Sequence, residues 1–296
     1  MTAAIQTRGL TKDFGALRAV DRLDLEVARG EVFGFLGPNG AGKTTTIRML
    51  LDFVRPTAGT ATVLDGSGAD PSVRRRIGYL PGELKLDRRY SAAEVVGYFG
   101  RLRGGYDAKF TQELLERFDL DLARPSGELS TGNRRKIGIV QAFMHRPELL
   151  ILDEPTSGLD PLLQNEFIAL VREEVARGAT VFLSSHLMPE VEALAGRVGV
   201  VRRGRLVAVA SVPELRRRAR HRLQFLIEGP WSPAEFQGIP GVISAAERDG
   251  ALEVVVEGSV DGVLKAVARH PVLRVTTPGD DLTDMFMSFY QEGPPP

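Results

Sequence analysis

The sequence predicts an α/β fold with a mostly parallel sheet, followed by a small α+β domain. Short continuous apolar runs, typical of strands buried on both faces, recur along the first two thirds of the chain. Helical patterns separate these runs, which favours strand–helix–strand units and a parallel sheet. The predicted strands are 32–36, 149–152, 180–183 and 198–201.

Two further parts are predicted around this core. Residues 1–30 alternate apolar and polar side chains, which predicts antiparallel strands with one face in solvent. Between about residues 91 and 146 the apolar spacing is helical, with Leu114, Leu115 and Phe118 on one face. We therefore expect an antiparallel β subdomain and a helical insert within a first domain at 1–215.

A second, accessory or regulatory α+β domain is predicted over residues 222–291. Its expected strands are 223–228, 242–247, 251–257 and 272–276, with helices at 234–237 and 260–267. Asp249 and Gly250 predict a hairpin turn between the second and third strands. The resulting order, strand–helix–strand–strand–helix–strand, is that of a ferredoxin-like fold.

The amino-acid composition excludes several classes of function for this chain. Lys+Arg and Asp+Glu both number 38, so no net charge attracts nucleic acid or an anionic membrane. The arginine clusters 74–76 and 216–218 could bind phosphates or lipid head groups, but they are interpreted as solvated faces or a linker helix in an arginine-rich chain. The chain has no Cys, which excludes a disulfide framework and a thiolate metal site. No apolar run approaches the roughly 20 residues that span a bilayer, so any action on a membrane is expected to use other chains.

The strongest motif for nucleotide binding follows the strand at 32–36 and precedes a helix. It consists of Gly37, Pro38, Asn39, Gly40, Ala41, Gly42, Lys43 and Thr44. This spacing and context are those of a P-loop, whose backbone N–H groups face phosphates at a helix N-terminus. Lys43 is expected to reach the β- and γ-phosphates, Thr44 to hold Mg²⁺, and Thr45 to complete the ATP-binding segment. A chance glycine-rich turn is the alternative.

An acidic pair follows the strand at 149–152, where an open α/β sheet places ligand groups. Asp153 is expected to bind the metal or its waters. Glu154 is expected to polarise the attacking water as general base. The alternative is a helix N-cap pair before Pro155.

Together these segments resemble the ATP-binding cassette (ABC) superfamily over about residues 5–215, specifically the separately encoded ATPase subunits of transporters. The resemblance implies that Phe14 stacks on adenine. It also implies that His186, after Ser184 and Ser185, is a switch histidine that contacts the γ-phosphate. Without the resemblance, Phe14 would be interpreted as a core aromatic and His186 as a surface residue.

The resemblance also assigns residues that act between two chains. Ser130, Thr131, Gly132 and Asn133 match the signature that caps the γ-phosphate bound by a partner subunit. Asp160 matches the loop that crosses the dimer interface, although by itself it would be an ordinary helix N-cap.

Three positions depart from the family pattern. Thr131 stands where the signature usually has Gly, and Asn133 where it usually has Gln. In the loop after residues 77–81, the usual Gln is replaced by Gly82, followed by Glu83. An acid cannot donate a hydrogen bond to the attacking water as an amide does, but Glu83 can accept one from Mg²⁺-bound water. These departures affect the predicted coupling to the transport subunit rather than the nucleotide site.

The function implied by the resemblance is ATP hydrolysis, with ATP and Mg²⁺, that drives transport through a separate transmembrane permease. The motif details and the extra domain look most like subunits of daunorubicin-resistance-type and related multidrug exporters. Two chains, identical or related, would pair head to tail and act on the permease through the helical insert and the Gly82–Glu83 loop. The chain is expected to be cytoplasmic, held by the permease at the inner face of the cell membrane, without a nucleic-acid partner.

Two alternatives stay open at this point. One is a soluble cassette ATPase acting on nucleic acid or ribosomes, which the single cassette and the absence of Cys disfavour. The other is a nucleotide-dependent regulatory module with little turnover, which the loss of the loop Gln would favour. Glu154 and His186, both present, argue against it.

Overall fold

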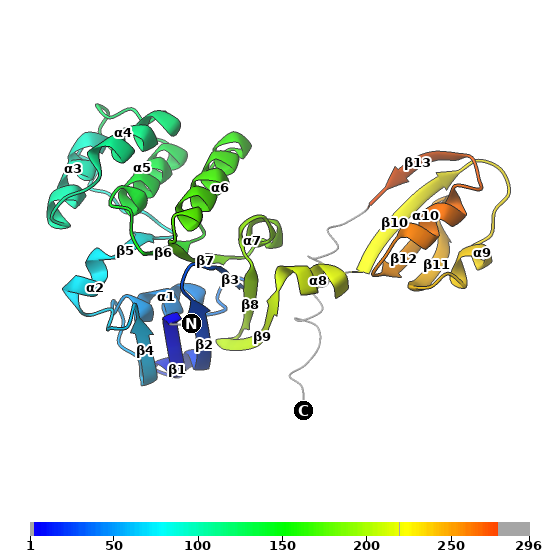
Figure 1. Ribbon diagram of the computed structural model, residues 1–296, viewed down its shortest axis with the longest axis horizontal. Coiled ribbons are helices and arrows are strands. Elements are labelled where there is room, and N and C mark those ends of the chain that lie inside the picture. The colour runs from blue at the N-terminus through cyan, green and yellow to red at the C-terminus, as the bar shows by residue number, and fades with distance from the viewer. Residues whose placement is uncertain (1–2, 219, 278–296) are drawn as a thin grey trace. The chain divides into compact units, whose positions relative to one another are not determined.

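A computed structural model describes residues 3–218 and 220–277 (Figure 1). The chain divides between Val209 and Ala210 into two compact units, which are described separately. The domain limits 1–215 and 222–291 stay a prediction, and residues 278–291 lie outside the described residues. No described helix has the length and apolar character needed to cross a membrane.

A three-stranded antiparallel sheet, in the order β2–β1–β4, opens the first unit. Its strands are β1 (Ala3–Phe14), β2 (Leu17–Ala28) and β4 (Ala58–Val63). In β2, Leu23, Leu25 and Val27 are buried while the residues between them are exposed, as the period-two pattern predicts. The antiparallel strands expected within residues 1–30 are therefore present.

A six-stranded sheet forms the centre of the first unit, in the order β5–β6–β7–β3–β8–β9. Its strands are β3 (Val32–Leu36), β5 (Ile77–Leu80), β6 (Leu149–Asp153), β7 (Thr180–Ser185), β8 (Arg197–Arg202) and β9 (Arg205–Ser211). The pairs from β5 to β8 are parallel. All four predicted strands belong to it, and every residue of β3, β6 and β7 is buried. The sequence interpretation missed β5, which is only four residues long, and β9, which alternates exposed and partly buried residues.

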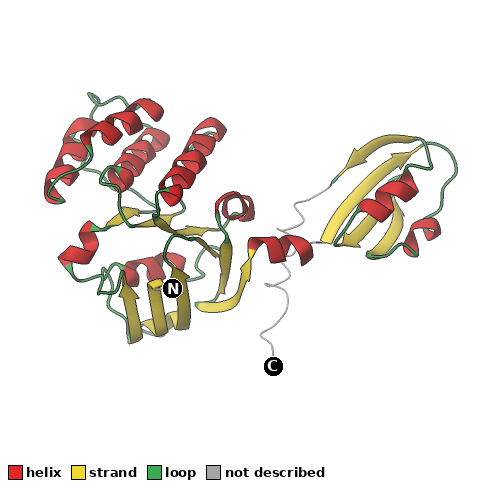
Figure 2. Ribbon diagram, in the orientation of Figure 1, coloured by secondary structure: helices red, strands yellow, loops and turns green. Residues whose placement is uncertain are grey.

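Helices cover both faces of this sheet (Figure 2). Helix α1 (Lys43–Leu50) contacts β6 of the central sheet and also β2 and β4, so it lies between the two sheets. The flanking helices are α2 (Pro71–Arg75), α6 (Pro161–Ala176) and α7 (Met188–Leu194). Helix α7 packs on β3 and β7 and α6 on β7. Parallel strands end at one edge of the sheet, and the loops after β3, β6 and β7 therefore meet there.

The helical insert consists of α3 (Ala92–Leu102), α4 (Ala108–Arg117) and α5 (Thr131–Phe143). Helix α5 packs against α3, α4 and strand β5 (Figure 1). Each helix begins at a side-chain cap: Ser91, Asp107 and Ser130 accept hydrogen bonds from their own first turns. The helices predicted between residues 91 and 146 are confirmed.

The second unit contains a four-stranded antiparallel sheet in the order β11–β12–β10–β13. Its elements are α8 (Val212–Arg218), β10 (Arg220–Ile227), α9 (Ala234–Gln237), β11 (Val242–Arg248), β12 (Ala251–Glu257), α10 (Asp261–Val267) and β13 (Val272–Thr276). Asp249 and Gly250, with φ of 52° and 76°, form the turn between β11 and β12, since both central residues of such a hairpin need positive φ. Phe225, Phe236 and Val254 lie in its own core.

A buried histidine in the first unit predicts a pH effect on stability. His145 lies against the Arg103 guanidinium, which also donates to the Ile77 carbonyl at 3.1 Å. Burial, together with the Arg103 charge, lowers the pKa of His145 to about 3. The ring is therefore neutral in the fold but becomes protonated in the unfolded chain below about pH 6.5. The contribution of the neutral ring to the free energy of unfolding is therefore fully present above about pH 6.5. It is lost as the pH falls toward the folded-state pKa.

We expect this group to reduce the free energy of unfolding by about 2 kcal/mol between pH 7 and pH 5. His145→Gln keeps an acceptor for Arg103 but cannot titrate, so its stability should fall less over this range. Urea unfolding of both proteins at pH 7, 6 and 5 measures the difference. Equal slopes of unfolding free energy against pH would contradict the expectation.

Candidate nucleotide site

A cavity of about 600 Å³ lies where the loops after β3, β5, β6 and β7 meet. Seven of the predicted site residues line it: Asn39, Thr44, Gly82, Glu83, Asp153, Glu154 and His186. Arg48, Tyr79, Pro81, Lys85 and Ser157 complete the lining. The parallel sheet thus brings together polar side chains from four separate stretches of the chain.

The loop between β3 and α1 has the backbone that a phosphate cradle needs. Gly42 has a φ of 102°, and a Cβ there would lie 2.4 Å from the Ala19 carbonyl oxygen, so only glycine fits. Lys43 follows as the first residue of α1 and is 6% exposed. Its ammonium donates to the Gly37 carbonyl at 2.5 Å and the Pro38 carbonyl at 3.3 Å. The cation is therefore held over the loop, at a helix N-terminus that favours anions.

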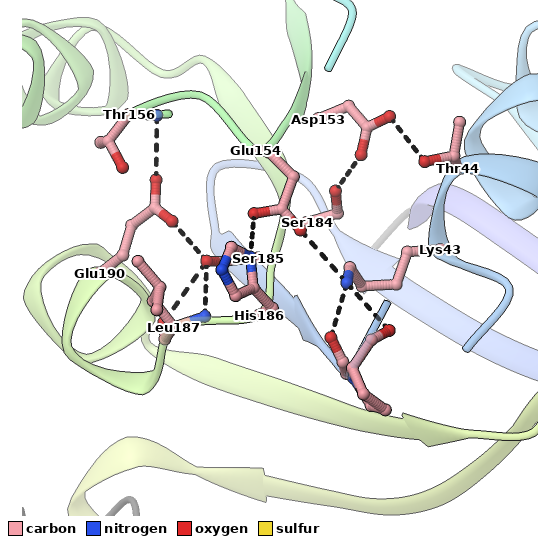
Figure 3. A network of polar contacts seen from close by, with 12 residues as sticks. Lys43, Thr44, Asp153, Glu154, Thr156, Ser184, Ser185, His186, Leu187 and Glu190 are labelled. Carbon is pink, nitrogen blue, oxygen red and sulfur yellow. Dashed lines mark hydrogen bonds and ion pairs between the residues drawn. The ribbon is translucent and has the colours of Figure 1, made fainter. Parts of the chain in front are cut away.

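Asp153, at the end of β6, is fixed from two sides (Figure 3). The Thr44 hydroxyl donates to Oδ2 at 2.9 Å, and the Ser184 hydroxyl donates to Oδ1. A hydroxyl and a carboxylate side by side form the donor set that Mg²⁺ takes when phosphates and waters supply its other ligands. No group of three or more His, Cys, Asp and Glu suited to a metal occurs among the described residues.

Glu154 lies at the centre of the polar network in Figure 3. Its Oε2 lies 2.7 Å from Nδ1 of His186, and its Oε1 lies 3.2 Å from Nζ of Lys43. Its backbone has a φ of 49°, an uncommon and strained conformation for a residue with a side chain. The carboxylate therefore faces the lysine and the histidine instead of continuing the strand. A carboxylate placed this way can accept a proton from a water molecule.

A second carboxylate, that of Glu190, supports the loops that carry these groups. Glu190 of α7 is 8% exposed and accepts hydrogen bonds from the Thr156 N–H at 3.3 Å and from the Ser185 hydroxyl (Figure 3). Burial raises its pKa, while these hydrogen bonds oppose the shift. Because Thr156 follows Glu154 closely and Ser185 precedes His186, Glu190 links the loops that carry both side chains.

The predicted signature lies at the start of α5 and does not line the cavity. The Ser130 hydroxyl accepts from the Asn133 N–H at 3.2 Å and caps the helix. A Cβ at Gly132 would lie 3.0 Å from the Gly158 carbonyl oxygen. Asp160 accepts from the Leu163 N–H at 3.0 Å and is the N-cap of α6. These residues are thus separate from the chain's own phosphate loop.

Phe14 and the loop after β5 lie differently from the rest of the predicted site. Phe14 is 50% exposed at the end of β1, outside the cavity lining. The Lys12 ammonium lies 5.0 Å from its ring centroid. Glu83 is exposed and pairs with Lys85 at 3.6 Å. A Cβ at Gly82 would lie 3.2 Å from Oδ2 of Asp153, so the loop passes close to the predicted metal ligand.

Sequence reasoning missed the residues that support the site. Ser184 and Glu190 hold Asp153 and the two loops, and Arg135 of α5 contacts the backbone around Glu154. Arg135 resembles any other arginine of an arginine-rich chain. Glu190 alone offered a signal, since it is an acid only four residues after His186, and the structure places it on the buried face of α7.

Comparisons with known proteins identify the family of the chain and a similar fold. A family model described as "ABC transporter" matches residues 20–157. The chain is 33% identical to the bacitracin transport ATP-binding protein BcrA of Bacillus licheniformis, covering 99% of both chains. It is 41% identical to the daunorubicin/doxorubicin resistance ATP-binding protein DrrA of Streptomyces peucetius, covering 73% of this chain and 67% of that protein.

A solved structure described as the ATP-binding subunit of an ABC transporter has the same fold. The match has a TM-score of 0.68 and 29% sequence identity, and it covers 73% of this chain and 92% of that structure.

Proposed function

This chain belongs to the ABC transporter family, as an ATP-hydrolysing subunit that energises export, and we propose the roles of its residues in that work. The observation that carries the assignment is the Glu154 carboxylate, held between Lys43 and His186 beside the Asp153–Thr44 pair. This arrangement suits the attack of water on a terminal phosphate.

ATP supplies the phosphoryl group, and Mg²⁺ would be held by Thr44 and by Asp153 or its waters. The backbone of residues 37–45 orients the phosphates, and Lys43 exchanges its carbonyl contacts for phosphate oxygens. Glu154 accepts a proton from the attacking water, and His186 contacts the γ-phosphate. Phe14 stacks on the adenine, a contact that its exposure leaves room for.

ATPases of this family act with transmembrane permeases and dimerise. We propose that two copies of this chain, or this chain and a related one, pair head to tail. Ser130 to Asn133 would then cap the nucleotide of the partner, and Asp160 would cross the interface. The position of the signature outside the chain's own cavity supports a role in trans.

A second cavity of about 500 Å³ is proposed as the permease contact. Phe53, Tyr79, Phe99 and Leu102 make it apolar, and its charged lining residues are Arg74, Arg75 and Arg103, without an acid. A permease segment with apolar and acidic side chains would complement it. The groove also includes Pro81, next to the coupling loop at Gly82 and Glu83. This contact would hold the chain at the inner face of the cell membrane.

The test compares ATP hydrolysis with membrane association. We expect the wild-type chain to hydrolyse ATP only when Mg²⁺ is present and to sediment with membranes of the producing strain. Leu102 is 65% exposed in the groove. We expect the variant Leu102→Asp to hydrolyse ATP at the wild-type rate as an isolated chain. Its membrane-bound fraction should fall about ten-fold. Val207→Asp, at an exposed position of β9, serves as the control. Absence of Mg²⁺-dependent hydrolysis would overturn the proposed roles, and unchanged sedimentation would overturn the contact.

The second unit is proposed as a ferredoxin-like accessory domain. Its element order and its sheet order β11–β12–β10–β13 support this assignment. The names of the relatives, bacitracin and daunorubicin transport or resistance proteins, support an antibiotic-like cargo. The nucleic-acid and regulatory alternatives are not favoured, because the relatives are transport subunits and the site retains Glu154 and His186.

A further inference from the structure

Arg135 is a buried cation whose role is not explained by the nucleotide site alone. It lies on α5, five residues after the Ser130 cap, and is 4% exposed. Burial lowers the pKa of its guanidinium to about 10, which still leaves it charged at neutral pH. A buried charge is costly unless hydrogen bonds compensate for the lost water.

The compensation comes entirely from backbone carbonyls. Nη1 donates to the carbonyls of Pro81 and Gly82, the second at 3.1 Å. Nη2 donates to those of Asp153, at 2.8 Å, and Glu154. Nε donates to that of Pro155 at 3.0 Å. A guanidinium has five N–H donors in a fixed fork, so each donor has its own carbonyl. Within the described chain no carboxylate forms an ion pair with Arg135.

These carbonyls belong to two segments that leave the sheet side by side, since Leu80 of β5 pairs with Leu152 of β6. Arg135 joins the two segments just beyond these last paired residues. Pro81 and Gly82 lie in the loop after β5, which departs from the family pattern by lacking Gln. Asp153 ends β6, and Glu154 and Pro155 begin the turn after it, where Glu154 has its strained backbone. Arg135 therefore connects the loop, the turn and the signature helix through a single planar group.

We propose that Arg135 is the positioning residue that aligns the Glu154 carboxylate with the Gly82 loop and the signature helix. Its side chain is buried and does not line the cavity of the nucleotide site. This inference rests on the proposed function of Glu154. Movement of α5 or of the loop, as expected when a permease or a second chain binds, changes the carbonyl positions and moves Glu154. In the family pattern, the Gln side chain of the loop after β5 makes this connection. In this chain Arg135 makes it from α5, through the backbone carbonyls of the loop and the turn.

The experiment compares Arg135→Lys with Arg135→Met in the full chain. Lysine keeps the charge but offers three donors on a single nitrogen, and methionine keeps much of the volume without donors. For Arg135→Lys we expect kcat to fall about 10- to 100-fold while the Kd for ATP changes less than about three-fold. Arg135→Met should lose at least as much kcat. Rates are expressed per ATP-binding-competent chain, so partial misfolding does not hide the effect.

Hydrogen exchange separates positioning from a general structural role. In Arg135→Lys, amides of residues 81–84 and 153–157 should exchange faster, with the sheet core unchanged. Arg101→Lys, the same change at an exposed position of α3, should change neither exchange nor kcat.

Three results would overturn the inference: kcat within two-fold of wild type, ATP affinity falling in parallel with kcat, or unchanged exchange in both segments. If wild type itself shows no hydrolysis, the proposed function fails instead, and the two failures are distinct.

Discussion

Glu154→Gln is expected to reduce ATP hydrolysis by about 10²- to 10⁴-fold, the usual contribution of a general base. The amide keeps the size of the side chain but cannot accept the proton of the attacking water. ATP should bind at least as tightly, because a negative charge beside the phosphates is removed. The ATP-bound dimer should therefore accumulate, since hydrolysis no longer reopens it.

Phosphate release in the steady state measures the first effect, and size-exclusion chromatography with ATP measures the second. Glu166→Gln, at an exposed position of α6 where Glu166 pairs with Arg117, is the matched control and should leave both unchanged. Wild-type turnover in Glu154→Gln would refute the general-base assignment. Lost ATP binding would instead indicate that the carboxylate mainly holds Lys43.

Lys43→Ala and Gly132→Asp are each expected to inactivate the chain, yet to complement one another when mixed. The first removes the cation that we propose binds the phosphates. The second places an anion where the γ-phosphate of the partner would lie. Its Cβ would lie 3.0 Å from the Gly158 carbonyl oxygen, so that loop must shift slightly, while the acid at a helix N-terminus is electrostatically favourable. In a head-to-tail dimer, a mixed pair has one complete site. With half of all dimers mixed, the mixture should recover about a quarter of the wild-type rate.

The control is a chain with both substitutions, mixed with either single variant, since no site is then complete. ATP-dependent pairing of differently tagged chains is measured in parallel. This detects one assembled site even if hydrolysis needs two. A mixture that recovers neither hydrolysis nor pairing would contradict the arrangement in trans.

Much of the first unit follows from local pattern. The all-apolar runs became β3, β6, β7 and β8 because a strand covered on both faces tolerates few polar residues. The P-loop was recognisable because its backbone conformation requires glycine, since few other residues adopt it, as at Gly42. Short or half-exposed strands such as β5 and β9 carry too few periodic residues to be recognised alone.

By itself, the sequence predicted which residues carry the chemistry: the phosphate loop, Asp153, Glu154 and His186 each stand in a motif of fixed spacing. Only the tertiary structure decided what holds them. The Ser184 contact with Asp153, the Glu190 bridge between two loops and the five carbonyls around Arg135 join residues far apart in the chain. Spacing along a chain encodes local backbone geometry, whereas a buried charge finds its partners only when separate elements pack. An arginine can be a solvated surface residue in one fold, whereas Arg135 here joins a loop, a turn and the signature helix.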